Sequence, residues 1–150
     1  MVGSYSRDGR QHGFLRRRTG EFISLDYPGA ALTYATGIND RGEVVGRWDS
    51  ADGREHGFHW LDGVFKTLDV PDAVQTLPDA INNRSDVVGR AVMKDGSVLG
   101  FYRHDGVFQT FSYPGARRTV ARGVNDNGDI VGPLEIPDGK GRGFLLRAKR

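Results

Sequence analysis

The chain has 150 residues, which suits one domain, and its 22 glycines, 37% hydrophobic content and mean hydropathy of -0.49 leave little apolar material for long buried helices. The absence of cysteine excludes disulfides and thiolate metal sites, and no run of about 18 apolar residues could span a membrane. Five of the 21 basic residues lie near the C-terminus, at Lys140, Arg142, Arg147, Lys149 and Arg150, which leaves 16 basic against 19 acidic residues elsewhere. Since nucleic-acid binders usually present a basic main face, we expect no nucleic-acid partner.

The chain repeats itself with a period of 43 residues. Val44-Val45-Gly46 recurs as Val87-Val88-Gly89 and as Ile130-Val131-Gly132, and Val2-Gly3 stands at the corresponding place before them. The chain therefore starts inside a repeat. Gly-Phe pairs mark the same period at Gly13-Phe14, Gly57-Phe58, Gly100-Phe101 and Gly143-Phe144. We expect a single repeat domain over residues 1–150, with approximate units 1–31, 32–74, 75–117 and 118–150.

Four short apolar runs in each complete unit predict four antiparallel strands joined by tight turns. The first unit begins with the second of these strands. In the second unit the expected strands run roughly from Thr33 to Ile38, Glu43 to Trp48, His56 to Leu61 and Val64 to Val70. The first turn is Asn39-Asp40-Arg41-Gly42, and later turns carry Asp-Gly, as in Asp52-Gly53 and Asp62-Gly63, a pair typical of hairpins.

The third unit repeats these four strands, and the last unit contains the first three of them, which gives 14 expected strands in the chain. Pro78 lies in the first strand of the third unit. Because proline has no backbone N–H, we expect Pro78 to shorten that strand.

Both faces of the expected sheets are apolar. In the third strand of the second unit, Phe58 and Trp60 alternate with His59 and Leu61, so bulky groups point to both sides. Each four-stranded unit therefore needs a neighbour on either side, as the blades of a β-propeller have. Small residues such as Gly37 in the first strands suit a crowded central axis.

The repeated motifs follow one pattern over essentially the whole chain. The pattern is Pro-Gly-Ala, then Gly-Ile-Asn-Asp-x-Gly-x-Val-Val-Gly, then Asp-Gly-x-x-His-Gly-Phe, then Gly-x-Phe-x-Thr. It resembles the HAF-type bacterial extracellular repeats. The resemblance implies a β-propeller from a secreted or cell-surface protein, without an agreed catalytic motif. No signal peptide follows Met1, which departs from the expectation for such a protein.

The fold class that we expect is an all-β propeller of four-stranded antiparallel blades. Fourteen strands amount to about three and a half blades, and a half-ring exposes an apolar sheet face at each end. Two copies would supply seven blades, so we expect a homodimer that closes one seven-bladed ring. The alternative is a β-trefoil, which also builds four-stranded repeats from about 150 residues but has fewer strands.

The histidines do not predict a metal or catalytic site. His12 and His56 occupy equivalent places before Gly-Phe, but the same place holds Leu99 and Arg142 in later units. His59 is interpreted as a packing residue, because apolar residues occupy its place in other units.

Two polar clusters have simpler interpretations than a ligand site. Asn125-Asp126-Asn127-Gly128-Asp129 offers oxygen ligands for calcium, but its counterparts predict a hairpin turn instead. Arg16-Arg17-Arg18 is interpreted as a solvated turn rather than a phosphate-binding patch. We therefore expect no catalytic residue, no metal and no cofactor.

The candidates for ligand recognition are Tyr27 and Tyr113, which precede Pro-Gly-Ala in two connections between units. An exposed tyrosine ring can stack on a sugar or a peptide, whereas a packed one would join neighbouring blades. The function that we expect is a non-enzymatic, extracellular-type binding or scaffold module with a carbohydrate or protein ligand. The alternative is a glycan-binding lectin with repeated pockets.

Overall fold

The computed structural model describes residues 1–148, which form an all-β structure without helices. Lys149 and Arg150 of the basic C-terminal segment lie outside the described residues. The strands are β1 (Val2–Arg7), β2 (Arg10–Arg16), β3 (Phe22–Leu25), β4 (Leu32–Ile38), β5 (Val44–Asp49), β6 (Glu55–Leu61), β7 (Val64–Leu68), β8 (Ala73–Ile81), β9 (Val87–Met93), β10 (Val98–His104), β11 (Val107–Phe111), β12 (Arg118–Thr119), β13 (Gly123–Val124), β14 (Ile130–Glu135) and β15 (Gly141–Leu146).

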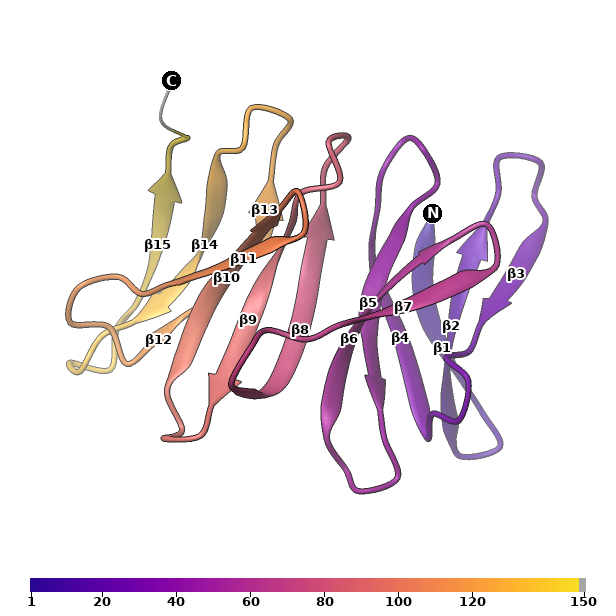
Figure 1. Cartoon of the computed structure of the whole chain (residues 1–150), viewed down its shortest axis with the longest axis horizontal. Helices are drawn as coiled ribbons and strands as arrows, with labels where there is room; N and C mark the ends of the chain where they lie inside the picture. Colours follow the sequence, from indigo (N-terminus) through magenta and orange to yellow (C-terminus); the bar gives the residue numbers. More distant parts are fainter. Residues whose placement is uncertain (149–150) are drawn as a thin grey trace.

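The strands are arranged as successive antiparallel groups in three sheets. β1 to β3 form one sheet, β4 to β7 form a second, and β8 to β15 form a curled, mixed sheet of eight strands. Within that sheet, β8 to β11 and β12 to β15 are joined by one parallel pairing of Val98 with Arg118. The chain thus contains four units that follow one another across the molecule, from β1–β3 to β14 and β15 (Figure 1). The expected strands of the second unit are found within two residues of their predicted bounds.

The Asp-Gly pairs lie in hairpin connections as expected; three of them form tight two-residue turns, whereas Asp52-Gly53 lies in a longer loop between the paired residues Asp49 and Glu55. Asp62 and Gly63 connect the paired residues Leu61 and Val64, and their φ angles of 47° and 89° are both positive. Two consecutive positive φ angles define the type I′ turn, whose twist matches that of antiparallel strands. Asp8-Gly9 closes the β1–β2 hairpin in the same way. The local sequence is therefore sufficient to explain where these strands reverse.

Both faces of the inner units are buried, as the sequence predicts. Val44 and Val45 are consecutive residues of β5 that point to opposite sides, and both are 0% exposed. Val44 packs toward the first unit, in a core with Leu15, whereas Val45 packs toward the third unit. Val87 and Val88 of β9 are likewise fully buried on opposite faces. Three hydrophobic cores therefore lie between the four units.

An extra residue interrupts the pairing of each first strand. Thr36 forms this bulge in β4 and Asp79 forms it in β8. In the last unit, residues 120–122 separate β12 from β13, and the last of them, Arg122, follows Asp79 by one repeat. The first strand of the last unit is therefore divided in two, and the structure has fifteen strands rather than the 14 expected. A guanidinium nitrogen of Arg122 lies 3.7 Å from a carboxylate oxygen of Asp79, so these bulges also join adjacent units.

The expectation that Pro78 shortens its strand is wrong. β8 has nine residues and is the longest strand in the described chain. Pro78 lies next to the bulge at Asp79, and a bulge is a position where a sheet tolerates proline because the regular ladder is already interrupted. The carbonyl of Pro78 accepts a hydrogen bond of 2.9 Å from the Thr36 hydroxyl, so the residue helps to join two units.

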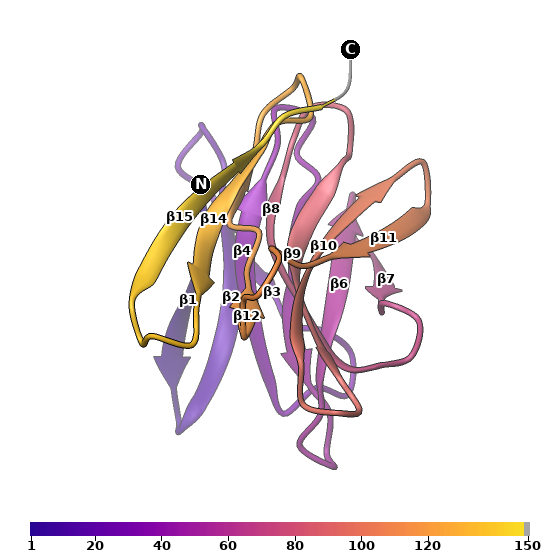
Figure 2. The same cartoon turned by 90° about the vertical axis from the view of Figure 1, so that its left-hand side faces the viewer.

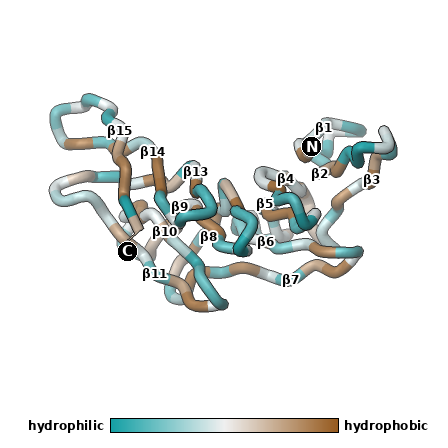
Figure 3. The backbone as a smooth tube through the Cα atoms, turned by 90° about the horizontal axis from the view of Figure 1, so that it is seen from above, coloured by the Kyte–Doolittle hydropathy of each residue, from teal (hydrophilic) through white to brown (hydrophobic). Residues whose placement is uncertain are grey.

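Glycines allow the close approach of strands within and between units. A Cβ atom on Gly37 would lie 3.1 Å from the Cα of Ala80 in the next unit, which confirms crowding between the first strands. A Cβ atom on Gly46 would lie 2.0 Å from the Tyr34 carbonyl oxygen and 2.7 Å from the Phe58 ring. The fourth strands β7 and β11 lie together along one margin of the molecule (Figure 3), and their side chains Lys66 and Gln109 are exposed.

The Gly46→Ala substitution should lower the free energy of unfolding by at least about 2 kcal/mol, because the added methyl group collides with backbone and with a fully buried ring. Urea denaturation at one fixed protein concentration measures this change. Gly141→Ala is the matched control, since no atom lies within 4 Å of the added Cβ there. Equal effects of the two substitutions would contradict the packing argument.

Candidate binding surfaces

Asparagine turns connect the units in a continuous series of hydrogen bonds. The Asn39 side-chain amide donates to the Asn82 carbonyl at 3.0 Å, and the Asn82 amide donates to the Asn125 carbonyl at 2.8 Å. In its own turn, the Asn82 Oδ1 accepts from the backbone N–H groups of Arg84 and Asp86. The sequence predicts this local turn, whereas the bonds between units depend on stacking residues that are 43 positions apart.

The Asn82→Ala substitution should lower the free energy of unfolding by about 2–3 kcal/mol, because it leaves several buried polar groups without partners. Urea denaturation measures the change. Asn127→Ala is the control, because Asn127 is exposed and contributes only its backbone N–H to the turn. A loss no larger than that of the control would show that the asparagine series is dispensable.

Each of the four histidines pairs with a carboxylate, which the sequence did not indicate. His12 lies 2.9 Å from Asp26, and His56 lies 2.8 Å from Asp69 at the equivalent place. His59 contacts Glu43 at 3.0 Å in addition to packing. His59 is therefore partly buried and also paired, because Glu43 directly precedes the neighbouring strand β5. Repetition of these pairs indicates a structural role.

The fourth pair, between His104 and Asp86, is the one with the largest contrast in exposure. Asp86 is fully buried, and its Oδ1 lies 2.5 Å from His104 Nδ1. Burial by itself would raise the pKa of Asp86, but hydrogen bonds from His104, Asn82 and Arg84 outweigh burial and hold that pKa below its usual value. The same hydrogen bond to Asp86 raises the pKa of His104 above its usual value.

The His104→Gln substitution should reduce stability most near pH 5. The stability that ionised Asp86 adds to the folded chain is lost as the pH falls from 3.8, the ordinary pKa of aspartate, through the lowered pKa of Asp86. The stability that protonated His104 adds is complete below pH 6.5, the ordinary pKa of histidine, and is lost as the pH rises through the raised pKa of His104. The difference in free energy of unfolding between the native chain and the variant should therefore shrink between about pH 5 and about pH 9. Urea denaturation at both pH values tests this, and an unchanged difference contradicts it.

Tyr27 is packed between units, although it also borders a polar hollow of about 500 Å³. Its ring stacks on Trp48 with 4.2 Å between centroids, and it meets Phe65 edge-on at 5.3 Å. Its hydroxyl shares a hydrogen bond of 2.7 Å with Thr67, and its backbone N–H donates to the buried Thr33 hydroxyl. These contacts favour the joining role that was the alternative to ligand recognition.

Tyr113 has the same place in the repeat but a different environment. It is 51% exposed, although its backbone N–H donates to Thr119 as the Tyr27 N–H does to Thr33. A cavity of about 270 Å³ lies beside it, lined by Phe111, Ser112, Tyr113, Pro114, Thr119, Phe144, Leu145 and Leu146. Of the two predicted residues, Tyr113 alone therefore lies at an open apolar site.

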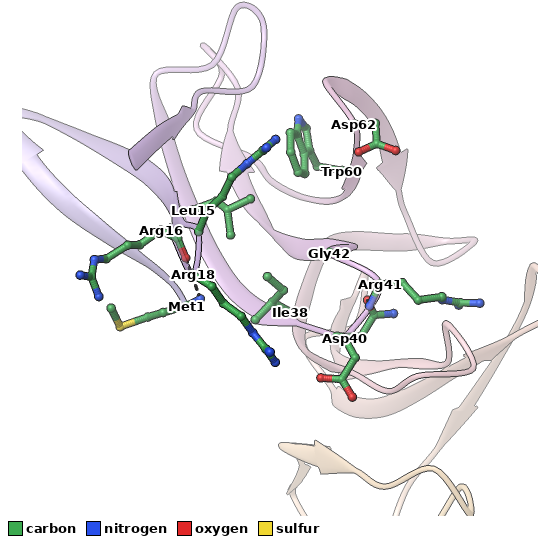
Figure 4. A pocket seen from close by; sticks show the side chains of 12 residues that line it. Met1, Leu15, Arg16, Arg18, Ile38, Asp40, Arg41, Gly42, Trp60 and Asp62 are labelled. Atoms are coloured by element: carbon green, nitrogen blue, oxygen red, sulfur yellow. Dashed lines mark hydrogen bonds between the residues drawn. The ribbon is translucent and has the colours of Figure 1, made fainter. Parts of the chain in front are cut away.

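The arginine triplet borders a groove of about 440 Å³ between the end of β2, the β4–β5 turn and the end of β6. Arg18 extends across this groove toward Asp40, whereas Arg16 and Arg41 point away from it (Figure 4). Arg17 pairs with Glu21 at 3.7 Å, so part of the positive charge is balanced locally. The exposed positions of the triplet agree with the interpretation as a solvated turn.

The outer face of the β1–β3 sheet is aromatic. Phe22 is 65% exposed, Tyr5 is 40% exposed, and both lie against the ring of Phe14 across a hollow of about 510 Å³. We call these three residues the first end face. Their equivalents in the second unit are Trp48, Phe58 and Phe65, which pack on the first unit.

The opposite end of the molecule has an aliphatic outer face. Val131 of β14 and Leu145 of β15 are directly paired and are 47% and 54% exposed. We call them the last end face, and β14 and β15 lie at the near end of the molecule in Figure 2. The equivalents of Val131 in the inner units are Val45 and Val88, both fully buried. Exposure at the two ends therefore reflects missing neighbours rather than a change in residue type.

Comparison with known protein families, characterised proteins and solved structures gives no match. Within residues 1–148, no helix is long and apolar enough to cross a membrane. The same residues contain no group of three or more histidine or acidic side chains placed to hold a metal ion.

Proposed function

We propose that the chain is a β-propeller repeat module that binds a second copy of itself through its end faces and acts as a non-enzymatic binding or scaffold protein. Its repeat arrangement and its resemblance to HAF-type extracellular repeats support this proposal. The main observation behind the proposal is that the residues of the exposed end faces occupy the same repeat positions as residues that pack between units inside the chain.

The internal contact between the first two units is the template for this association. Phe58 packs there on Val2 and Leu15 of the preceding unit. Val131 and Leu145 stand at the same repeat positions as Val2 and Leu15. The last end face of one copy therefore resembles the Val2 and Leu15 surface against which Phe58 lies inside the chain. The first end face of a second copy, which contains the equivalent Phe14, could pack on it in the same way. Such a pairing would remove large exposed apolar groups from water.

A propeller agrees better with the hydrogen-bonding pattern than a β-trefoil does. In the first two sheets, each strand pairs only within its own repeat among the described residues. A trefoil would join strands of different repeats in a common barrel. The four units are instead held together by side-chain packing and by hydrogen bonds such as that from Asn39 to Asn82, and the short β10–β12 pairing is the one strand pairing between units among the described residues.

Two chains joined at both end faces form a closed ring with two equivalent interfaces. A ring of seven sheets would require the first and last units to share one sheet. Among the described residues, the first unit has its second to fourth strands and the last unit has its first to third, so one shared sheet would contain six strands instead of the four of an inner unit. With four units in each chain, we therefore propose that the ring of two chains has eight.

The scaffold function is better supported than the glycan-binding alternative. Repeated sugar sites would need equivalent open aromatic rings, but Tyr27 is stacked on Trp48 and bonded to Thr67. Tyr113 is the exposed member of the pair and supports at most one such site.

The Val131→Lys substitution should prevent self-association, because it places a charge at the centre of the last end face. Size-exclusion chromatography with light scattering should give twice 16.5 kDa for the native chain and about 16.5 kDa for the variant. Val64→Lys is the matched control, since Val64 is an exposed valine on β7 outside both end faces. A native chain that stays monomeric at micromolar concentration would contradict the proposed association.

A further inference from the structure

The outer edge of β15 has no partner strand among residues 1–148, although the corresponding strand of each other unit has one. β2 pairs with β3, β6 with β7, and β10 with β11, always as the third and fourth strands of a unit. The β15 strand pairs only with β14. Its free edge therefore offers backbone N–H and C=O groups to an added strand.

The cavity beside Tyr113 lies where the fourth strand of an inner unit places an aromatic ring. In the second unit, Phe65 of β7 meets both Tyr27 and Phe58 edge-on, each with 5.3 Å between centroids. The equivalents of Tyr27 and Phe58 two repeats later are Tyr113 of the third unit and Phe144 of the last unit, and both line this cavity. A cavity of roughly 150 Å³ can hold a benzene ring, so about 270 Å³ has room for one aromatic side chain.

The hydrogen bond of the Tyr27 hydroxyl indicates a second side chain that a strand added to β15 would need. This hydroxyl bonds to Thr67, which lies two residues after Phe65 in β7. Tyr113, the equivalent of Tyr27, lines the cavity. The sequence Phe-x-Thr occurs in two of the three fourth strands, at Phe65 to Thr67 and at Phe108 to Thr110, and β3 has the related sequence Phe-Ile-Ser.

We propose that the β15 edge and the cavity beside Tyr113 form a binding site for an extended peptide that contains Phe-x-Thr. The peptide adds antiparallel to β15 as a fourth strand. Its phenylalanine fills the cavity against Phe144, and its threonine hydroxyl bonds to Tyr113. Backbone pairing supplies affinity and the two side chains supply specificity.

This site meets the surface proposed for self-association at Leu145, which borders the cavity, whereas Val131 of that surface does not line it. Phe144 and Leu145 are consecutive residues of β15, so their side chains point to opposite faces of the sheet. Phe144 faces the third unit and the cavity, whereas Leu145 lies on the last end face. Peptide binding and dimer formation can therefore be measured independently.

The test is a fluorescence polarisation titration of the whole chain against a labelled peptide with the sequence of residues 62–70, Asp-Gly-Val-Phe-Lys-Thr-Leu-Asp-Val. We expect saturable binding that weakens at least about tenfold when alanine replaces the peptide phenylalanine. Hydrogen exchange should become slower in the backbone amides of β15 when the unaltered peptide is bound.

A double-mutant cycle tests the predicted hydrogen bond without disturbing the fold. Tyr113→Phe in the protein, or valine for threonine in the peptide, should each weaken binding about two- to tenfold. The two changes together should cost little more than either one alone, because both remove the same bond. Tyr27→Phe is the control and should leave peptide affinity unchanged, since that ring is packed inside the chain.

Three outcomes would overturn the proposal. One is the absence of saturable binding, and another is equal binding of the phenylalanine and alanine peptides. The third is binding that occurs only as the light-scattering mass falls to that of one chain, which would assign the β15 edge to a second copy. Failure of Val131→Lys to change the mass would bear on the end faces alone.

Discussion

Burial of both faces of each inner sheet is the constraint on which the rest of the structure depends. Consecutive valines at Val44-Val45 and Val87-Val88 have no access to solvent, which is possible only when sheets lie on either side. Gly46 and Gly89 make this close packing possible, because each leaves room for the phenylalanine of the neighbouring strand. The period of 43 residues is thus a packing period, in which each inner unit supplies one half of two hydrophobic cores.

Polar contacts at the strand ends keep the packed units in register. Hydrophobic packing is not directional, so it does not by itself fix how far one sheet slides over the next. The hydrogen bonds from Asn39 to Asn82 and from Asn82 to Asn125 are directional and join the same point of successive units. The contacts of the bulge residues Thr36 and Asp79 do the same along the first strands.

The same constraint explains where the molecule can interact with other molecules. Residues at the end faces have the chemistry of interior residues and differ from them only in lacking a neighbour. Tyr27 and Tyr113 show this contrast within one motif, since the first is covered by Trp48 and Phe65 and the second is open. The β15 edge is a second kind of incomplete contact, in which backbone pairing rather than face packing is missing.

The repeat, the strand positions, the Asp-Gly hairpins and the double burial of the sheets can be predicted from the sequence, because they depend on local backbone preferences and on alternation along a strand. The folded chain was needed to show that Pro78 sits beside a bulge in the longest strand, that every histidine has a carboxylate partner, and that Tyr27 and Tyr113 differ. The difference comes from distance along the chain. These features depend on contacts between separate strands or units, and the sequence alone does not show which of those neighbours is present.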